Sequence, residues 1–361
     1  MTYSSRRSGG RRLAPTLATA AAALLVLSAC TTAQEAEQEE APEDDTGCPV
    51  EVDESVSATA QIAFQPIPNG DLIVRDEGWL EECMPNAEID WSQFSSGAEV
   101  VQAFGSGTID VGLLGSSPAV MVVSPPLDID AQVVWIHNII GEAESLVAHG
   151  DVSEITDLAG GTIAVPYGST AHLSLLNALD DAGLAVGEDV DLINLQPDAM
   201  LGAWEREEID AAWVWHPTLE VLLEDGTLIM SSEDTAEVGT ATYDLAGATT
   251  EFIEANPEFM TIWTELQDLA VQQIAEDPDR AAENIAAQLG ISPDEAAMQM
   301  EGYVYLNAAE QAGADYFGGG LGDDLTLTGD FLVEQNEIPE AASAEHYAEA
   351  VYSDAIDSAA Q

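Results

Sequence analysis

The sequence predicts an α/β fold with parallel sheets. From residue 55 onward, short apolar runs that include β-branched or aromatic residues, bounded by Gly, Pro or Asp, alternate with amphipathic stretches. Such runs are typical of buried parallel strands, and their regular alternation with helical patterns indicates sheets covered by helices. At 361 residues, the chain has room for two domains or for one large two-lobed unit.

Apolar periodicity locates the individual elements. The predicted strands are ATAQIAFQ, DVGLLG, AQVVWIH, SLVAHG, TIAVPYG and DAAWVW. The intervening stretches AEVVQAFGSG and TAHLSLLNALDDAG carry apolar residues at helical spacing. A glycine stops each of them, Gly105 or Gly107 in the first and Gly183 in the second. From residue 250 to about 314 nearly every residue is a helix former, which predicts a helical C-terminal third.

The N-terminus has the pattern of a secretory signal over residues 1–29. Arginines precede the apolar run LATAAAALLVLSA, which ends just before Cys30. This run is shorter than the roughly 20 residues that cross a bilayer. Leu27-Ser28-Ala29-Cys30 resembles the lipobox of bacterial lipoproteins, which implies that cleavage leaves Cys30 lipidated and anchored to the cell membrane. An ordinary secreted protein with a cysteine at the cut is the alternative.

A flexible tether is predicted from Cys30 to residue 54. Residues 31–47 hold many acids and no large apolar side chain, a composition that cannot build a core. The other two cysteines, Cys48 and Cys83, form an even pair in an oxidising compartment, which predicts a disulfide. Two free thiols are the alternative.

The charge of the chain is extreme. It has 67 acidic residues, only seven basic ones and no lysine, for a formal net charge of −60. This balance excludes nucleic acid as a partner. The absence of lysine excludes Schiff-base catalysis and Walker-type phosphate sites. Because 46% of the residues are hydrophobic, the acids are expected to coat a folded surface rather than a disordered chain.

Three Ser/Thr clusters stand where a predicted strand gives way to a helix. They are Ser-Ser-Gly at 95–97, Gly-Ser-Ser-Pro at 115–118 and Gly-Ser-Thr at 168–170. A helix N-terminus offers free backbone N–H groups and a partial positive charge, so such starts can hold an oxyanion without a cationic side chain. Open α/β sheets bind ligands at this edge. Ordinary helix capping is the alternative for each cluster.

Acids flanked by apolar sequence are candidates for binding an ammonium group. Asp210 begins DAAWVW, Glu144 stands just before SLVAHG, and Asp244 lies in ATYDLAG. A carboxylate in such surroundings needs a backbone cap or a cation. A solvated surface acid is the alternative. Trp215 could offer its ring face to the same cation, and His172 could bond a ligand or hold the local structure.

Nothing in the sequence indicates an enzyme or a metal site. The chain lacks HExxH, CxxC, GxGxxG and GxSxG patterns, and its five histidines show no metal-ligand spacing. We therefore predict neither a cofactor nor a metal.

Several longer stretches together resemble a known family. They are FSSGAEVVQAFGSGTIDVGLLGSSP, GEAESLVAHG, IAVPYGSTAHLSLLNAL, NLQPDAMLGAWEREEIDAAWVWHP and VYLNAAEQ. These stretches are similar to the taurine-binding proteins of ABC importers, within a wider group for sulfonates, nitrate and thiamine precursors. The resemblance covers about residues 56 to 350. It implies a two-lobed type II periplasmic-binding-protein fold with two crossing strands and a ligand cleft between the lobes.

The resemblance also implies how the chain is divided and what it does. Lobe 1 would take residues 55–144 and 243–361, lobe 2 would take 145–242, and the crossings would fall near 145–149 and 243–248. A monomeric extracytoplasmic protein would deliver its ligand to an ABC permease with its ATPase. The alternatives are a binding protein for an alkanesulfonate, nitrate or a thiamine precursor, and an enzyme on the same fold.

The site residues follow from the same resemblance. The sulfonate is expected near Ser116, Ser117, Ser169 and Thr170, with His172 close by. The amine is expected near Asp210 and Glu144, with Gln65 and Trp215 lining the cleft. Asp244 stands in a segment that is more apolar in the family, and the PIPNGD loop and the cysteine pair are further departures. Taurine or a similar small sulfonate would satisfy both ends of this site.

The acidic surface predicts that stability depends on salt. Crowded surface carboxylates repel one another, and molar salt shortens the Debye length to about 3 Å. We expect the melting temperature of the mature domain to rise from low to molar NaCl, as followed by circular dichroism. A melting temperature indifferent to salt would contradict this prediction.

Overall fold

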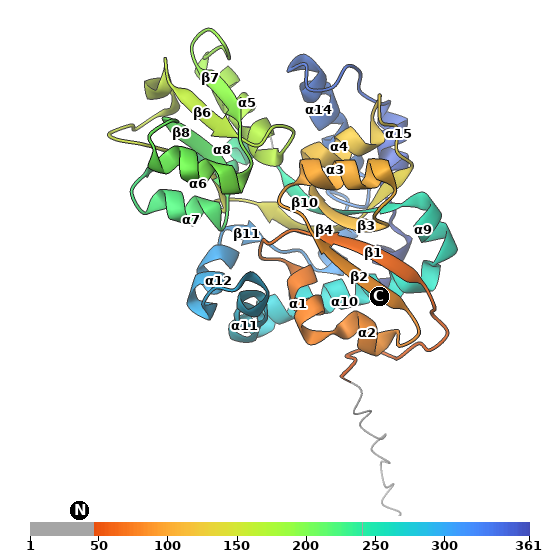
Figure 1. Ribbon diagram of the computed structural model, residues 1–361. Helices are drawn as coiled ribbons and strands as arrows, with labels where there is room; N and C mark the ends of the chain where they lie inside the picture. Colours follow the sequence, from red (N-terminus) through yellow and green to blue (C-terminus); the bar gives the residue numbers. More distant parts are fainter. Residues whose placement is uncertain (1–46, 240) are drawn as a thin grey trace, which may run out of the picture. The chain divides into compact units, whose positions relative to one another are not determined.

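The computed structural model describes residues 47–239 and 241–361 (Figure 1). The predicted signal and Cys30 lie outside the described residues, as does most of the predicted tether. The described part belongs to one compact unit that contains two sheets, each with its own apolar core. The predicted α/β class is thereby confirmed.

The first sheet has six strands in the order β11-β4-β10-β3-β1-β2. Their bounds are Thr59–Phe64 for β1, Glu88–Gln93 for β2, Val111–Gly115 for β3, Ala131–Ile140 for β4, Tyr243–Thr249 for β10 and Tyr303–Val304 for β11. Strand β1 runs parallel to β2 and β3, whereas β10 runs antiparallel to β3 and β4. Fully buried Trp135 and Trp263 belong to the core around this sheet.

The second sheet has five strands in the order β7-β6-β8-β5-β9. Their bounds are Glu144–Ala148 for β5, Thr162–Val165 for β6, Asp191–Asn194 for β7, Ala211–Trp215 for β8 and Thr227–Ser231 for β9. Strand β6 is parallel to β7 and β8, and β5 is antiparallel to β8 and β9. All six predicted strands form. Both sheets are mixed rather than parallel, because β5 and β10, the first strands after the chain passes from one sheet to the other, run antiparallel to their neighbours.

Helices flank both sheets. Their bounds are Gly70–Glu77 (α1), Trp79–Cys83 (α2), Gly97–Ser106 (α3), Ser116–Val123 (α4), Thr170–Ala182 (α5), Pro197–Glu205 (α6), Thr218–Leu223 (α7), Ser232–Glu237 (α8), Thr250–Ala255 (α9), Pro257–Glu276 (α10), Pro278–Leu289 (α11), Pro293–Met300 (α12), Ala308–Gln311 (α13), Gly320–Glu334 (α14), Ala344–Glu349 (α15) and Asp354–Ala359 (α16), with a 3₁₀ turn at Ile155–Leu158. Within the described ranges, none of these helices is long and apolar enough to span a membrane.

The predicted helix stops are accounted for by left-handed glycines. Helix α3 ends at Gly107, with φ of 65°, and α5 ends at Gly183, with φ of 71°. A side chain is strained in this conformation, which explains why glycine ends both helices.

The chain changes sheets between β4 and β5 and again between β9 and β10. The stretches expected near the crossings, 145–149 and 243–248, form the greater part of β5 and β10, each within a single sheet, and the changes of sheet lie just before them. Continuous apolar runs such as SLVA are buried as strands. The first change of sheet instead takes place over residues 141–143.

A close backbone contact holds this first change of sheet. Gly141 and Ala143 both donate N–H groups to the carbonyl of Gly302, at 3.1 and 3.2 Å. A Cβ atom on Gly302 would lie 2.5 Å from the Ala143 nitrogen, so only glycine fits at position 302. The contact therefore fixes both Glu144, the first residue of β5, and Tyr303, the first residue of β11.

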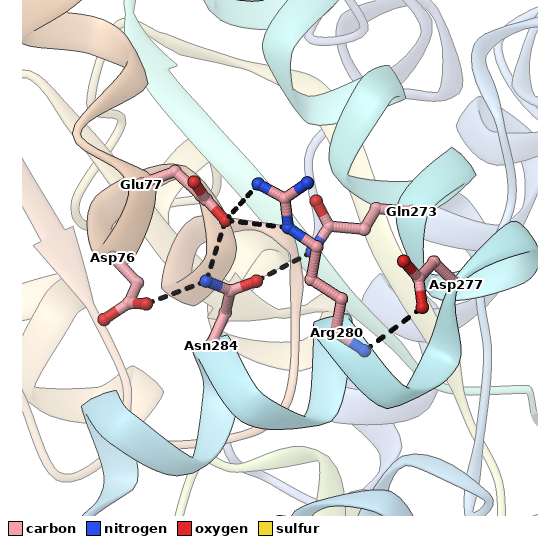
Figure 2. Close-up of polar contacts among 6 residues, drawn as sticks. All are labelled: Asp76, Glu77, Gln273, Asp277, Arg280 and Asn284. Atoms are coloured by element: carbon pink, nitrogen blue, oxygen red, sulfur yellow. Dashed lines mark hydrogen bonds and ion pairs between the residues drawn. The ribbon is translucent and has the colours of Figure 1, made fainter. Parts of the chain in front are cut away.

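Helix α11 is joined to α1 by polar contacts (Figure 2). The Arg280 guanidinium lies 2.8 Å from the Glu77 carboxylate, and the Asn284 amide donates to Asp76 at 2.8 Å and to Glu77 at 2.9 Å. One of the few basic side chains is thus used to neutralise acids between two helices.

A disulfide joins Cys48 to Cys83, the last residue of α2. The Asp53 N–H also donates to the Cys83 carbonyl at 2.9 Å. Residues 47–54 are therefore attached to the folded unit, although they were expected to belong to the flexible tether. The disulfide accounts for this difference, because it anchors a segment that has few apolar side chains of its own.

We expect reduction of this disulfide to lower the free energy of unfolding by about 3 kcal/mol, because the open chain regains loop entropy. Urea unfolding with and without a reductant would measure the change. The double variant Cys48→Ala/Cys83→Ala is the control, since its unfolding should not respond to reductant. Two titratable thiols in the untreated protein would contradict the prediction.

Candidate ligand-binding site

A pocket is lined by residues of both lobes, each of which is one sheet with its helices. Glu144, which was expected to end the first lobe, is the first residue of β5 in the second sheet. From the first lobe come Gln65, Ile67, Gly97, Gly115, Pro118, Ile140, Asp244 and Tyr303, and from the second come Glu144, Ser169, Thr170 and Trp215. The space between these walls, including its mouth, is about 360 Å³. Several of these residues end a strand or directly follow one, as expected for a ligand site in an α/β protein.

Three helix N-termini meet in the pocket wall. Gly97 begins α3, Gly115 caps α4 and Ser169 caps α5. The packing is tight, because a Cβ atom on Gly115 would lie 2.5 Å from the Thr170 methyl carbon. The three predicted Ser/Thr clusters are thus brought together, and their backbone N–H groups and helix dipoles favour an anion.

Two hydroxyl groups beside these helix starts are buried without a hydrogen-bond partner among the described residues. They belong to Ser96 and Ser117, and both side chains are fully buried. A buried hydroxyl without a partner loses the hydrogen bonds that it made to water. Ser96 precedes Gly97 and Ser117 precedes Pro118 of the pocket lining, but neither serine lines the pocket itself.

Two buried carboxyl groups form another part of the wall. Glu144 accepts hydrogen bonds from the Thr170 hydroxyl at 2.7 Å and from the Ser232 hydroxyl at 2.8 Å. Burial raises the pKa of Glu144 to about 7, although these hydrogen bonds act in the opposite direction. Burial and the nearby charge of Glu144 raise the pKa of Asp244 to about 8. This part of the pocket favours a cation.

No basic side chain lines this pocket. Each arginine of the described part is engaged elsewhere: Arg75 lies 4.2 Å from the Phe64 ring centroid, Arg206 pairs with Glu208 at 2.7 Å, and Arg280 pairs with Glu77. The aromatic walls are Trp215 and Tyr303. Burial raises the pKa of Tyr303, so its hydroxyl stays neutral and can donate a hydrogen bond.

The structure brings many of the residues expected at the site together. Gln65, Glu144, Ser169, Thr170, Trp215 and Asp244 line the pocket. Ser116 and Ser117 lie in the first turn of α4, between Gly115 and Pro118 of the wall, and Ser116 accepts a hydrogen bond from the Tyr243 N–H at 3.4 Å. Ile67, Ile140 and Tyr303 were missed, because their sequence surroundings carry no sign of a ligand.

His172 lies outside the pocket lining. Its ring stacks on Tyr167 with centroids 4.6 Å apart, and its Nδ1 accepts from the Gly168 N–H at 3.3 Å. Burial lowers the pKa of His172 to about 4, so the ring is neutral at physiological pH. These contacts support the turn before α5 rather than a direct contact with a ligand.

The structure corrects the position expected for Asp210. Its exposed carboxylate accepts from the Thr162 N–H at 2.7 Å, and it stands before the first residue of β8, whereas Trp215 ends that strand in the pocket wall. The sequence expectation placed Asp210 and Trp215 in one site, although they stand at opposite ends of β8 and only Trp215 lines the pocket. Asp210 therefore caps a backbone group, which was the alternative interpretation.

Residues 58–291 match the model of the NMT1-like family. The chain belongs to this family. Among curated proteins, this family member is 35% identical to the taurine-binding periplasmic protein of Escherichia coli K12 over 263 residues, which cover 71% of this chain and 81% of that protein.

Solved structures with the same fold include binding proteins and an enzyme. The alkanesulfonate-binding protein of Xanthomonas axonopodis, bound to MOPS, has a TM-score of 0.67 and 20% identity over 82% of this chain and 98% of its own. The desulfurization enzyme DszB has a TM-score of 0.60 and 16% identity over 84% of this chain and 98% of its own. At these identities the comparisons establish that the family member shares their fold.

Removing the unpartnered hydroxyl of Ser96 or Ser117 should affect the stability of the protein less than removing the hydrogen-bonded hydroxyl of Ser169. Replacing Ser96 or Ser117 by Ala should leave the free energy of unfolding of the empty protein unchanged within about 1 kcal/mol, because no hydrogen bond is lost. Ser169→Ala is the matched variant and should cost about 1 kcal/mol, because it removes the cap that accepts from the His172 N–H. Denaturant unfolding would measure all three. A loss of 2 kcal/mol or more in Ser117→Ala would show an unseen partner.

Proposed function

We propose that the protein is the extracytoplasmic solute-binding component of an ABC importer and that it captures taurine or a closely related small organosulfonate. The similarity to the E. coli taurine-binding periplasmic protein supports this proposal. The aliphatic sulfonate-binding proteins among its more distant relatives support the same chemical class.

The observation that carries the proposal is the division of the pocket into an anion-binding and a cation-binding part. The three helix starts favour a sulfonate, whereas Glu144 and Asp244 favour an ammonium group. Trp215 adds a ring face for the cation. A short zwitterion satisfies both parts, whereas nitrate or a simple alkanesulfonate would bring a negative charge close to two acids with no counter-charge.

Capture would work as a clamp. The wall residues come from both lobes, and the chain passes between the lobes at the two changes of sheet. A ligand that contacts both lobes stabilises the closed form over the open one, because only the closed form makes both sets of contacts. The closed form would then be recognised by the membrane permease with its ATPase. We propose that the protein acts as a monomer, anchored at the membrane through lipidated Cys30.

An enzyme on the same fold is the second candidate, because the desulfurization enzyme DszB shares the fold. Thiol chemistry would need a free cysteine, but both cysteines of the described ranges are joined to each other. The pocket lining also contains no histidine that could activate a serine. Binding without turnover is therefore the function that these residues support.

We expect the purified mature domain, in high salt, to bind taurine with a Kd in the micromolar range or below in isothermal titration calorimetry. Glu144→Gln and Asp244→Asn should each weaken binding by roughly tenfold to a hundredfold, because each removes a charge-assisted hydrogen bond to the ammonium group.

Asp210→Asn is the matched control, because its carboxylate lies outside the pocket and an amide oxygen can still accept from Thr162. It should leave the affinity for taurine unchanged. Nitrate and a longer alkanesulfonate complete the ligand series. If taurine gave no heat while another ligand bound, the transport role would stand and taurine as the ligand would be wrong.

A further inference from the structure

The two carboxyl groups of the pocket share one confined space. Glu144 and Asp244 both line the pocket, and both are at most 6% exposed. The two oxygens of Glu144 are hydrogen-bonded to hydroxyls, which donate but carry no charge. Two negative charges in such a site repel each other and are poorly solvated, so the pair is costly when fully ionised.

No neighbouring group neutralises this pair. The groups that act on Asp244 are Glu144 on β5, Asn138 on β4, and the neutral phenols Tyr303 on β11 and Tyr305 just beyond it. Burial lowers the pKa of His172 and His216 to about 4, so both histidines are uncharged at neutral pH. The arginines of the described part all lie at other contacts. A proton is then the cation that remains available to the empty pocket.

We propose that the empty pocket holds one proton on the Glu144–Asp244 pair and that the ammonium group of the ligand displaces this proton into solvent on binding. This inference rests on the proposed function, because it takes the ligand to be an amine-bearing sulfonate. The carboxyl O–H bond breaks, its electron pair stays on the carboxylate oxygen, and the proton passes to the buffer. The net charge of the acid pair together with its cation is the same before and after binding.

The proton makes the site discriminate between ligands. A zwitterion brings a cation that replaces the proton, whereas a sulfonate without an amine can bind only while the proton stays. Burial places the pKa of Glu144 near 7 and that of Asp244 near 8, so the exchange falls at physiological pH. Because ammonium binding favours the ionised pair, affinity for taurine should rise with pH by up to about tenfold per unit and level off above about pH 8. Affinity for an amine-free sulfonate should fall over the same range.

The test is calorimetric titration of the mature domain at pH 7 in two buffers of different ionisation enthalpy, phosphate and imidazole. Sulfonate buffers are avoided, because a structural neighbour was solved bound to MOPS. The difference in binding enthalpy between the two buffers, divided by the difference in their ionisation enthalpies, gives the number of protons released per ligand bound. We expect close to one proton released for taurine and none for 2-hydroxyethanesulfonate, which is of similar size but has no amine.

Two variants test whether the released proton comes from the Glu144–Asp244 pair or from another acid of the protein. Asp244→Asn should lower proton release with taurine to about half, because burial alone still holds the pKa of Glu144 at about 7. It should also raise the affinity for 2-hydroxyethanesulfonate, since it removes a charge that repels the sulfonate. Asp324→Asn is the matched control, because Asp324 is also partly buried and accepts from the Tyr243 hydroxyl at 2.6 Å but lies outside the pocket lining. It should leave proton release unchanged.

The infrared spectrum of the empty protein detects a protonated carboxyl group directly, through its C=O stretching band. A protonated-carboxyl band at pH 7 should lose intensity in Asp244→Asn and on addition of taurine, while the contribution of buried Asp71, whose pKa burial raises to about 7, should remain. Tight taurine binding with no proton release, or release that Asp244→Asn leaves undiminished, would overturn the inference and leave the proposed function intact. If taurine does not bind, the proposed ligand is wrong, and a carboxyl band that Asp244→Asn leaves unchanged would then overturn the inference independently.

Discussion

The site depends on one backbone contact, the approach of residues 141–143 to the carbonyl of Gly302. It lies where the chain first leaves one sheet for the other, and it leaves no room for a side chain at position 302. On one side it sets Ile140 and Glu144 at the ends of β4 and β5, and on the other it sets Tyr303 at the start of β11. All three residues line the pocket. Glu144 is then held by hydroxyls from α5 and α8, so a buried carboxylate connects the crossing to two helices of the second lobe.

The pocket shows how a chain without lysine can recognise an anion. The arginines of the described part are engaged at helix contacts, on an aromatic ring and in a surface pair, so the anion part of the pocket relies on backbone N–H groups and hydroxyls. These groups are fixed by the fold and do not collapse onto the acids of the same pocket, as a flexible basic side chain would. The two kinds of recognition can therefore stand within one small space, and a ligand with both charges matches both of them.

The same fold carries a binding protein and a desulfurization enzyme among the solved structures, so the fold alone does not decide the activity. In this chain the cysteines of the described ranges form a disulfide that joins residues 47–54 to α2, and neither cysteine lines the pocket. The pocket groups are hydroxyls, amides, carboxyls and aromatic rings, which suit reversible binding. Function in this family member therefore follows from which side chains stand at the helix starts and strand ends.

Local sequence determined much of this protein: the six apolar strands, the glycine stops of α3 and α5, the cysteine pair and the Ser/Thr clusters at three helix starts. The strands, helix stops and helix starts depend on neighbours a few residues away, so periodicity and capping chemistry are enough to predict them. The cysteine pair followed instead from an even count of cysteines in an oxidising compartment. Tertiary structure alone decided that Asp244 and Glu144 share a pocket, that Asp210 caps a turn outside it, and that Tyr303 forms part of the wall. The physical reason is distance along the chain. Asp244 reaches the site only because β10 inserts antiparallel between β3 and β4, and such a pairing depends on the packing of the whole sheet.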